Sequence, residues 1–177
     1  MPILKIARMG HPVLWTRAAP VEPGGTALAR LLADMEETLA DAGGVGLAAP
    51  QIFQPLRLFI YHIPPGRGGD DTGVPLTLVC NPVVTPLGQA QALGWEGCLS
   101  IPGLRAAVPR YTHIRLAGQD AQGAPFVREL SGFEARVVQH ENDHLDGILY
   151  PMRLRDFTYF GFNEETERFA QPLPEIL

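Results

Sequence analysis

The sequence predicts an α+β fold, in which antiparallel β-sheets pack around a helix in the C-terminal half and a further helix lies near the N-terminus. Two stretches, at about residues 26–42 and 131–147, carry apolar residues at helical spacing. Between them lie short β-rich runs that Gly and Pro separate. Because these runs follow one another without helices between them, hairpins are favoured over alternating βαβ units.

Length and composition indicate one globular domain spanning residues 1–177. Hydrophobic residues make up 46% of the chain and charged residues 19%, a balance that excludes a disordered protein. The net charge of -5 and the lack of a Lys/Arg cluster predict no direct binding of nucleic acid. The sequence shows no signal peptide, import sequence or membrane-spanning run, so we expect a cytoplasmic protein without a membrane partner.

The first part of the chain predicts a surface segment followed by a helix. Residues 1–24 are rich in Pro and Gly and are expected to wrap the surface, with a turn at residues 11–14. Thr26 is the predicted N-cap of a helix that runs to Ala42 and that Gly43 ends. Its predicted buried stripe consists of Leu28, Leu31, Leu32, Met35 and Leu39.

The middle of the chain predicts a series of short strands. They are expected at residues 56–63, 75–81, 83–93, 105–108, 111–116 and 125–130. Residues 64–73 read as an exposed polar loop, and residues 120–123 (DAQG) as a hairpin turn.

The second helix has a well-marked beginning and end. Ser131 and Glu134 match a capping box, with Ser131 at the N-cap and Glu134 three residues later. Gly147 is placed to end the helix. The residues predicted to pack inward are Phe133, Val137 and Leu145.

This helix carries a candidate metal site in residues 140–144 (HENDH). Four residues separate His140 from His144, which puts both imidazoles on one helical face where they can bind the same ion. Glu141 is rotated away from that face and is a candidate general base. The alternative is an ordinary amphipathic helix with two half-buried histidines.

Three positions, Tyr150, Glu164 and Cys98, decide which kind of third metal ligand the sequence offers. Tyr150 stands where a metzincin needs histidine, which excludes that class. Glu164 has the downstream spacing of a thermolysin-like zinc endopeptidase, but it lies in a polar segment typical of a solvated face. Cys98, in residues 96–100 (EGCLS), offers a thiolate that binds zinc or iron strongly and, with the two histidines, leaves one position open.

Three segments of the sequence together resemble the signature motifs of the peptide deformylase family. They are residues 44–51 (GVGLAAPQ), 96–100 (EGCLS) and 139–147 (QHENDHLDG), in the family's order and with similar separations. Residues 133–138 (FEARVV) resemble the organellar-type branch and its bacterial relatives. The resemblance implies a bacterial, metal-dependent hydrolase that removes the N-formyl group from the N-terminal methionine of newly synthesised polypeptides and releases formate.

The resemblance also implies a role for individual residues. The implied metal ligands are Cys98, His140 and His144, with Glu141 as the catalytic carboxylate. Gln51 and the backbone N–H of Leu99 would hold the formyl oxygen. The implied peptide-pairing residues are Gly44, Val45 and Gly46. Arg105 follows the second motif closely and is a further candidate for substrate binding.

The implied cofactor is one divalent metal ion, for which the resemblance favours Fe²⁺ in the cell, while Zn²⁺ or Ni²⁺ can occupy the same ligands. The implied partners are N-formyl-Met nascent peptides at the ribosome exit. Two alternatives remain. One is a zinc endopeptidase that uses His140, His144 and Glu164. The other is a catalytically silent, ribosome-associated metal-binding module, against which the presence of Glu141 and Gln51 argues.

Overall fold

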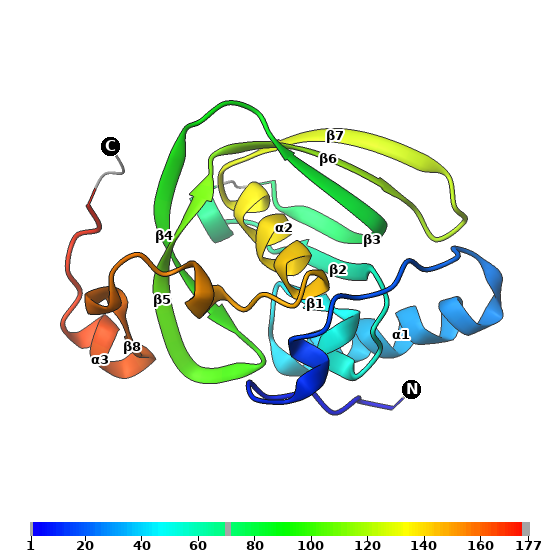
Figure 1. Ribbon diagram of the computed structural model, residues 1–177, viewed down its shortest axis with the longest axis horizontal. Coiled ribbons are helices and arrows are strands. Elements are labelled where there is room, and N and C mark those ends of the chain that lie inside the picture. The colour runs from blue at the N-terminus through cyan, green and yellow to red at the C-terminus, as the bar shows by residue number, and fades with distance from the viewer. Residues whose placement is uncertain (1, 70–71, 175–177) are drawn as a thin grey trace.

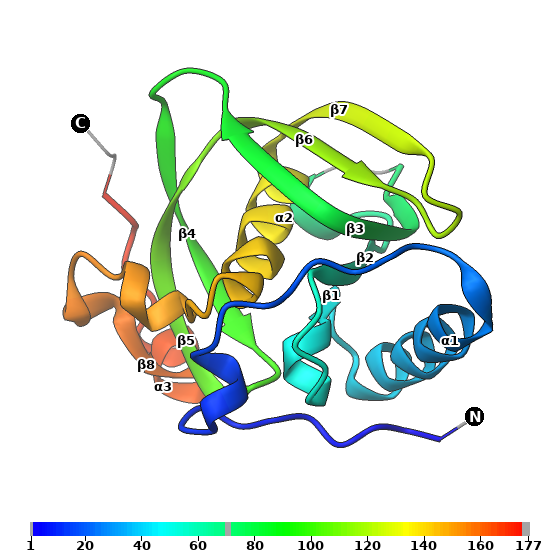
Figure 2. The same cartoon turned by 45° about the vertical axis from the view of Figure 1, so that its right-hand side comes forward.

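The computed structural model describes residues 2–69 and 72–174, and its central feature is a helix between two antiparallel sheets (Figure 1). The larger sheet has the strand order β1-β2-β3-β6-β7, and the smaller sheet has the order β4-β5-β8. Helix α2 lies between the sheets, whereas α1 lies outside them (Figure 2). The predicted α+β class, with antiparallel sheets around this helix, is confirmed.

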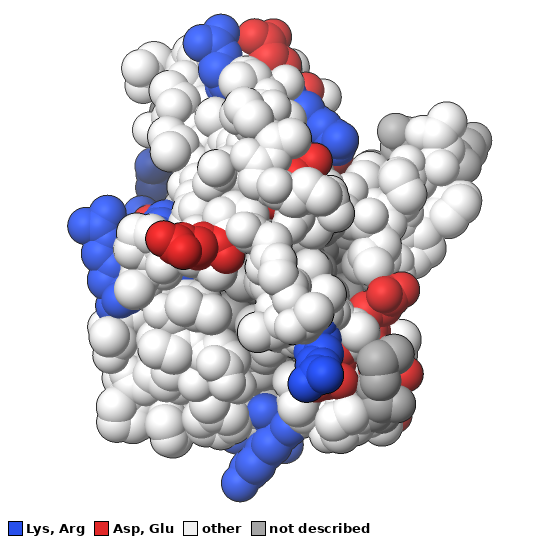
Figure 3. Space-filling view, turned by 90° about the vertical axis from the view of Figure 1, so that its right-hand side faces the viewer, with Lys and Arg blue, Asp and Glu red and all other residues white. Residues whose placement is uncertain are grey.

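The helices are α1 (Gly25–Ala42), α2 (Gly132–Leu145) and α3 (Asn163–Arg168). The strands are β1 (Gly46–Ala48), β2 (Leu58–Ile63), β3 (Val74–Pro86), β4 (Gln91–Cys98), β5 (Ile101–Tyr111), β6 (His113–Gln119), β7 (Pro125–Ser131) and β8 (Phe160–Phe162). Within the described parts of the chain, no helix is both long and apolar enough to span a membrane. On the face in Figure 3, basic and acidic side chains are scattered among a mostly uncharged surface.

The strand limits predicted around Pro82 were wrong. A single strand, β3, runs from Val74 through Pro82 to Pro86, and β4 begins only at Gln91. The chain passes the proline because Asn81 takes a positive φ of 49° and the register shifts between Cys80 and Val83. This bulge lets β3 pair first with β2 and then with β6, since the residue without an N–H lies outside the regular ladder.

Strands β4 and β5 form one long hairpin rather than the short pieces expected. Their register runs from Gln91 opposite Tyr111 to Cys98 opposite Ile101. Leu99 and Ser100 therefore form the tip of the hairpin, with Cys98 next to them at the end of a strand. The hairpin brings this cysteine into contact with His144 of α2.

Helix α1 begins before the predicted position. Its N-cap is Gly24, with a φ of 96°, and Thr26 is already inside the helix, so the predicted Thr26 cap was wrong. A glycine reaches this conformation without a steric penalty, which lets the chain turn directly into the helix. At the other end, Gly43 adopts the left-handed conformation and ends the helix as predicted.

The N-cap of α2 is Ser131 as predicted, but the capping box does not form. The Ser131 side chain makes no capping hydrogen bond. Glu134 instead accepts a hydrogen bond of 2.8 Å from the Tyr61 hydroxyl of β2. Packing therefore positions this helix. Val138 and Leu145 are fully buried, and burial of each side chain contributes about 1.5–3 kcal/mol to the stability of the fold.

Several elements were not predicted from the sequence. Strand β1 forms at the small residues before Ala49, and β8 and α3 form after the turn at Phe157–Tyr159. The predicted loop at 64–73 contains a turn at Arg67–Gly69, and its described residues 64–68 are exposed as expected. The predicted hairpin turn at 120–123 joins β6 and β7, with Asp120 accepting from the backbone N–H of Gln122.

Candidate metal centre

Three side chains with metal-binding atoms meet between the β4–β5 hairpin and α2. They are Cys98, His140 and His144, and their ligand atoms all lie within 4.8 Å of one another. The Sγ atom of Cys98 is 3.3 Å from Nε2 of His144. A tetrahedral zinc site would place a sulfur and a nitrogen ligand about 3.5 Å apart. The spacing and the donor types therefore fit a divalent ion.

His140 is oriented by a buried carboxylate that the sequence prediction did not assign. Its Nδ1 atom is 2.9 Å from Oε2 of Glu96, which leaves Nε2 facing Cys98. The Tyr150 ring stacks on the imidazole at a centroid distance of 6.2 Å. A carboxylate behind a histidine ligand fixes its tautomer and ring orientation. Glu96 and Cys98 are two residues apart on β4, so they share one face, and this spacing was the available signal.

Two arginines keep Glu96 ionised. Arg110 donates to both Glu96 oxygens at 2.9 Å, and Arg136 donates to Oε1 at 2.8 Å. Burial alone would raise the pKa of Glu96, but hydrogen bonds from Arg110 and His140 bring it well below its usual range. The ionised carboxylate is thus placed to accept a hydrogen bond from Nδ1 of His140.

Glu141 lies inside the pocket next to the ligand cluster. The carboxylate is buried, and its Oε2 atom has no hydrogen-bond partner within the described residues. Burial raises the pKa of Glu141 to about 7. A cation nearby would favour the ionised form. Gly46 faces this side chain, and a Cβ there would overlap the carboxylate, so the glycine is what leaves it room.

Gln51 reaches the cluster from the turn at Ala49–Ile52. Its Oε1 atom accepts from the Ala48 backbone N–H at 2.8 Å. Its Nε2 atom lies 3.2 Å from Oγ of Ser100 and 3.5 Å from Sγ of Cys98. The amide nitrogen of a buried glutamine thus lies next to the candidate metal ligands.

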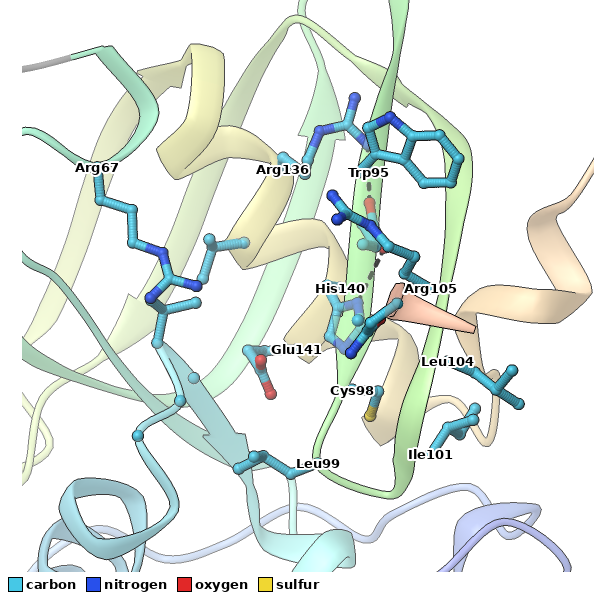
Figure 4. A pocket seen from close by; sticks show the side chains of 18 of the residues that line it. Arg67, Trp95, Cys98, Leu99, Ile101, Leu104, Arg105, Arg136, His140 and Glu141 are labelled. Carbon is cyan, nitrogen blue, oxygen red and sulfur yellow. Dashed lines mark hydrogen bonds and ion pairs between the residues drawn. The ribbon is translucent and has the colours of Figure 1, made fainter. Parts of the chain in front are cut away.

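A pocket of about 550 Å³ opens over these groups (Figure 4). Most of the residues predicted for the site line it, namely Gly44, Val45, Gly46, Gln51, Cys98, Leu99, Arg105, His140 and Glu141. His144 is buried beneath, with 1% of its surface exposed. At the rim, Arg105 lies 4.8 Å from the centre of the Trp95 ring and pairs with Glu167 of α3 at 2.9 Å.

One wall of this pocket is the edge of the larger sheet. Strand β1 is the first strand of that sheet and pairs with β2, with Gly46 opposite Tyr61. Gly46, at the start of this strand, and the preceding Gly44 and Val45 line the pocket. An edge strand with small residues leaves backbone groups accessible to an extended peptide.

Three other acidic residues, Glu164, Asp143 and Asp146, lie outside the ligand cluster. Glu164 is exposed on α3 and is not part of the metal-ligating group found among residues 2–69 and 72–174. Asp143 binds Arg110 at 2.6 Å, so it supports His140 only through Arg110 and Glu96. Asp146 pairs with Arg57 at 2.7 Å, away from the ligands.

Comparison with known proteins gives a single family. The family model described as polypeptide deformylase matches residues 3–159. The chain is 55% identical to peptide deformylase 1 of Bordetella pertussis, over 90% of this chain and 92% of that protein. It is 51% identical to peptide deformylase 1 of Nitrosomonas europaea, over 92% of each.

Solved structures of the same family have the same fold. A Met-Ala-Ser-bound class I type b peptide deformylase from Acinetobacter baumannii has a TM-score of 0.81 and 34% identity, covering 86% of this chain and 99% of that one. The peptide deformylase from Thermus thermophilus has a TM-score of 0.76 and 45% identity, covering 86% of each chain.

Proposed function

The chain belongs to the peptide deformylase family of metal-dependent hydrolases, and from this premise we propose how its residues perform the reaction. The enzyme removes the N-formyl group from nascent peptides and releases formate. The observation that carries the residue assignment is the convergence of three ligand atoms, a buried carboxylate and a glutamine amide in one pocket.

Cys98, His140 and His144 would hold the metal ion, with His140 fixed by Glu96. A bound divalent cation supplies Lewis acidity, which lowers the pKa of water at the site and polarises the formyl carbonyl. The thiolate and imidazole donors suit iron, zinc and nickel. We propose Fe²⁺ as the ion in the cell, where a thiolate ligand also makes the site sensitive to oxidation.

Glu141 moves the proton. Its carboxylate accepts a proton from the attacking water and then donates it to the amine that leaves with the peptide. Its burial favours the protonated form between these two steps, because a neutral carboxyl group avoids the cost of a buried charge. General acid–base catalysis of this kind contributes about 10²–10⁴-fold to the rate.

Gln51 and the backbone N–H of Leu99 stabilise the oxyanion. Negative charge develops on the formyl oxygen as its carbon is attacked, and both donors lie next to Cys98. The Leu99 amide lies at the hairpin tip, where the chain direction is fixed by the ladder on either side. Each preorganised donor lowers the free energy of the transition state by on the order of 3 kcal/mol.

The peptide substrate would bind as an extra strand against Gly44, Val45 and Gly46, with Arg105 at the rim. The Met-Ala-Ser peptide bound to the Acinetobacter baumannii relative supports a short peptide occupant that begins with methionine. We further propose that the enzyme meets its substrates as they leave the ribosome, in the bacterial cytoplasm. The bacterial origin of its relatives supports this placement.

The test of this ligand set is metal content after reconstitution with zinc under anaerobic conditions. Cys98→Ala should lose the bound zinc, whereas Glu164→Gln should retain it at one equivalent, because Glu164 is exposed on α3. Cys80→Ala is the matched control, since Cys80 is buried in a core cluster that contains none of the ligands. If Cys98→Ala retained its zinc and Glu164→Gln lost it, the zinc endopeptidase alternative would be favoured instead.

A further inference from the structure

The orientation of the Gln51 amide depends on the hydroxyl group of Ser100. We infer that Ser100 is a positioning residue for the reaction, because its side-chain oxygen holds one N–H of Gln51 so that the other N–H faces the formyl oxygen. This inference rests on the proposed role of Gln51 in stabilising the oxyanion. Ser100 lies at the tip of the β4–β5 hairpin, two residues after Cys98.

The identity of the two Gln51 amide atoms follows from their neighbours. The Ala48 backbone N–H can only donate, so the atom 2.8 Å from it must be the oxygen of the amide. The nitrogen therefore faces the opposite way, 3.2 Å from Oγ of Ser100. Gln51 and Ser100 are each 1% exposed, so bulk water does not compete for these hydrogen bonds.

The two amide hydrogens of Gln51 have different partners. The hydroxyl oxygen of Ser100 accepts one of them. The same nitrogen is 3.5 Å from Sγ of Cys98, which places the second hydrogen on the side of the metal ligands. With both the oxygen and one hydrogen anchored, the amide has little freedom to rotate. A donor fixed before the reaction stabilises the oxyanion without a cost of reorganisation.

Ser100 also links this donor to the metal ligand. Its backbone N–H lies 3.4 Å from Sγ of Cys98, and its carbonyl accepts from the Met9 backbone N–H at 2.8 Å. The residue that orients the Gln51 amide is thus itself fixed relative to the Cys98 sulfur. Removal of the hydroxyl would leave these backbone contacts in place and release only the amide.

A double-mutant cycle tests the inference, with formate release from formyl-Met-Ala-Ser as the assay and zinc-loaded protein throughout. Ser100→Ala should lower kcat about 10-fold and keep KM within about twofold of the wild-type value. The reason is that the oriented Gln51 amide stabilises the transition state much more than the bound substrate. In the Gln51→Met background, the same substitution should change kcat by less than about twofold. Ser131→Ala, which deletes an exposed hydroxyl without a capping bond, should leave kcat unchanged.

An unchanged kcat in Ser100→Ala, or an equal loss in both backgrounds, would overturn the inference while leaving the role of Gln51 intact. If Gln51→Met alone kept the wild-type kcat, the oxyanion role itself would be wrong. Should Ser100→Ala fail to fold, NMR of the zinc-loaded wild-type protein tests whether Ser100 anchors the Gln51 amide. One Gln51 side-chain amide proton should exchange with solvent much more slowly than the other. Equally fast exchange of both would contradict the anchoring by Ser100.

Discussion

At the residue scale, the imidazole of His140 shows how the site is prepared for a metal. Glu96 binds its Nδ1 atom, Tyr150 stacks on its face, and its Nε2 atom is left for the ion. The two proposed histidine ligands could be predicted, since their spacing follows from helical periodicity, whereas Cys98 was identified by its own motif. The spacing of Glu96 and Cys98 places both on one face of β4, but the contacts of Glu96 with Arg110 and His140 could not be predicted, because they join residues 14 and 44 positions apart in the sequence.

Glu141→Gln separates proton transfer from metal binding. The amide has the shape of the carboxylate but cannot accept the proton, so kcat should fall by about 10²–10⁴-fold. Metal content should stay at that of the wild type, because Glu141 is not among the ligating groups. Steady-state formate release and elemental analysis of the same samples measure both quantities. A variant with near-wild-type kcat would remove Glu141 from the mechanism.

Cys80 should make the fold sensitive to alkaline pH. Burial, with a smaller contribution from Asp120, raises its pKa from 9.0 to about 11. Between these values the unfolded chain loses the thiol proton and the folded chain keeps it, so stability falls as the pH rises. From pH 8 to 11, the free energy of unfolding should fall by roughly 2–3 kcal/mol more in the wild type than in Cys80→Ala.

Urea denaturation of both zinc-loaded proteins at a series of pH values measures this difference. Because the cavity left by the alanine lowers stability at every pH, only the slopes are compared. Parallel curves would show that the Cys80 thiol does not titrate differently in the two states.

At the scale of elements, Arg136 joins α2 to the β4–β5 hairpin. Its guanidinium donates to Glu96 and to the backbone carbonyls of Ala92 and Val108, each within 2.8 Å. It fits because Gly94 has no side chain: a Cβ there would lie 2.7 Å from the guanidinium. These contacts could not be predicted from the sequence, because the acceptors lie on two strands distant from Arg136 in the chain.

Arg136→Met tests the importance of this connection. The substitution removes donors from part-buried carbonyls and from Glu96, so the free energy of unfolding should fall by on the order of 2–4 kcal/mol. Arg115→Met is the control, because Arg115 pairs with Glu129 on the exposed surface and such pairs contribute at most about 1 kcal/mol. Chemical denaturation measures both variants, and equal losses would show that the Arg136 contacts contribute no more than an exposed surface pair.

The elements that sequence reasoning predicted best are those that local patterns determine. Alternating and periodic apolar residues predicted β2, β7 and α2, and turn residues predicted the β6–β7 hairpin. The path of β3 through Pro82 was not predictable, because pairing with two different strands outweighs the local tendency of proline to end a strand. The Ser131–Glu134 cap failed for a similar reason, since Tyr61 binds Glu134.

At the scale of the whole molecule, the metal site connects two parts of the fold. Cys98 comes from the smaller sheet, and both histidines come from the helix that packs on the larger sheet. An ion bound to all three should therefore stabilise the folded protein by RT ln(1 + [L]/Kd), about 2.7 kcal/mol at 100 times Kd. Removal of zinc by a chelator should lower the Tm in scanning calorimetry, and zinc should restore it.

Cys98→Ala provides the control for this prediction, because it should show a Tm that depends little on zinc. If the wild type and this variant responded alike to chelation, the ion that stabilises the protein would be bound elsewhere.

The most direct test of deformylase activity is formate release from formyl-Met-Ala-Ser, with N-acetyl-Met-Ala-Ser as the matched amide control. The anaerobic, Fe²⁺-loaded wild type should release one formate for each free N-terminal amine that appears and leave the acetyl peptide essentially uncleaved. Chelation should abolish this release, and Glu141→Gln should lower it by about 10²–10⁴-fold. Cleavage of internal peptide bonds without formate, or no formate release with any divalent metal ion, would contradict the assignment.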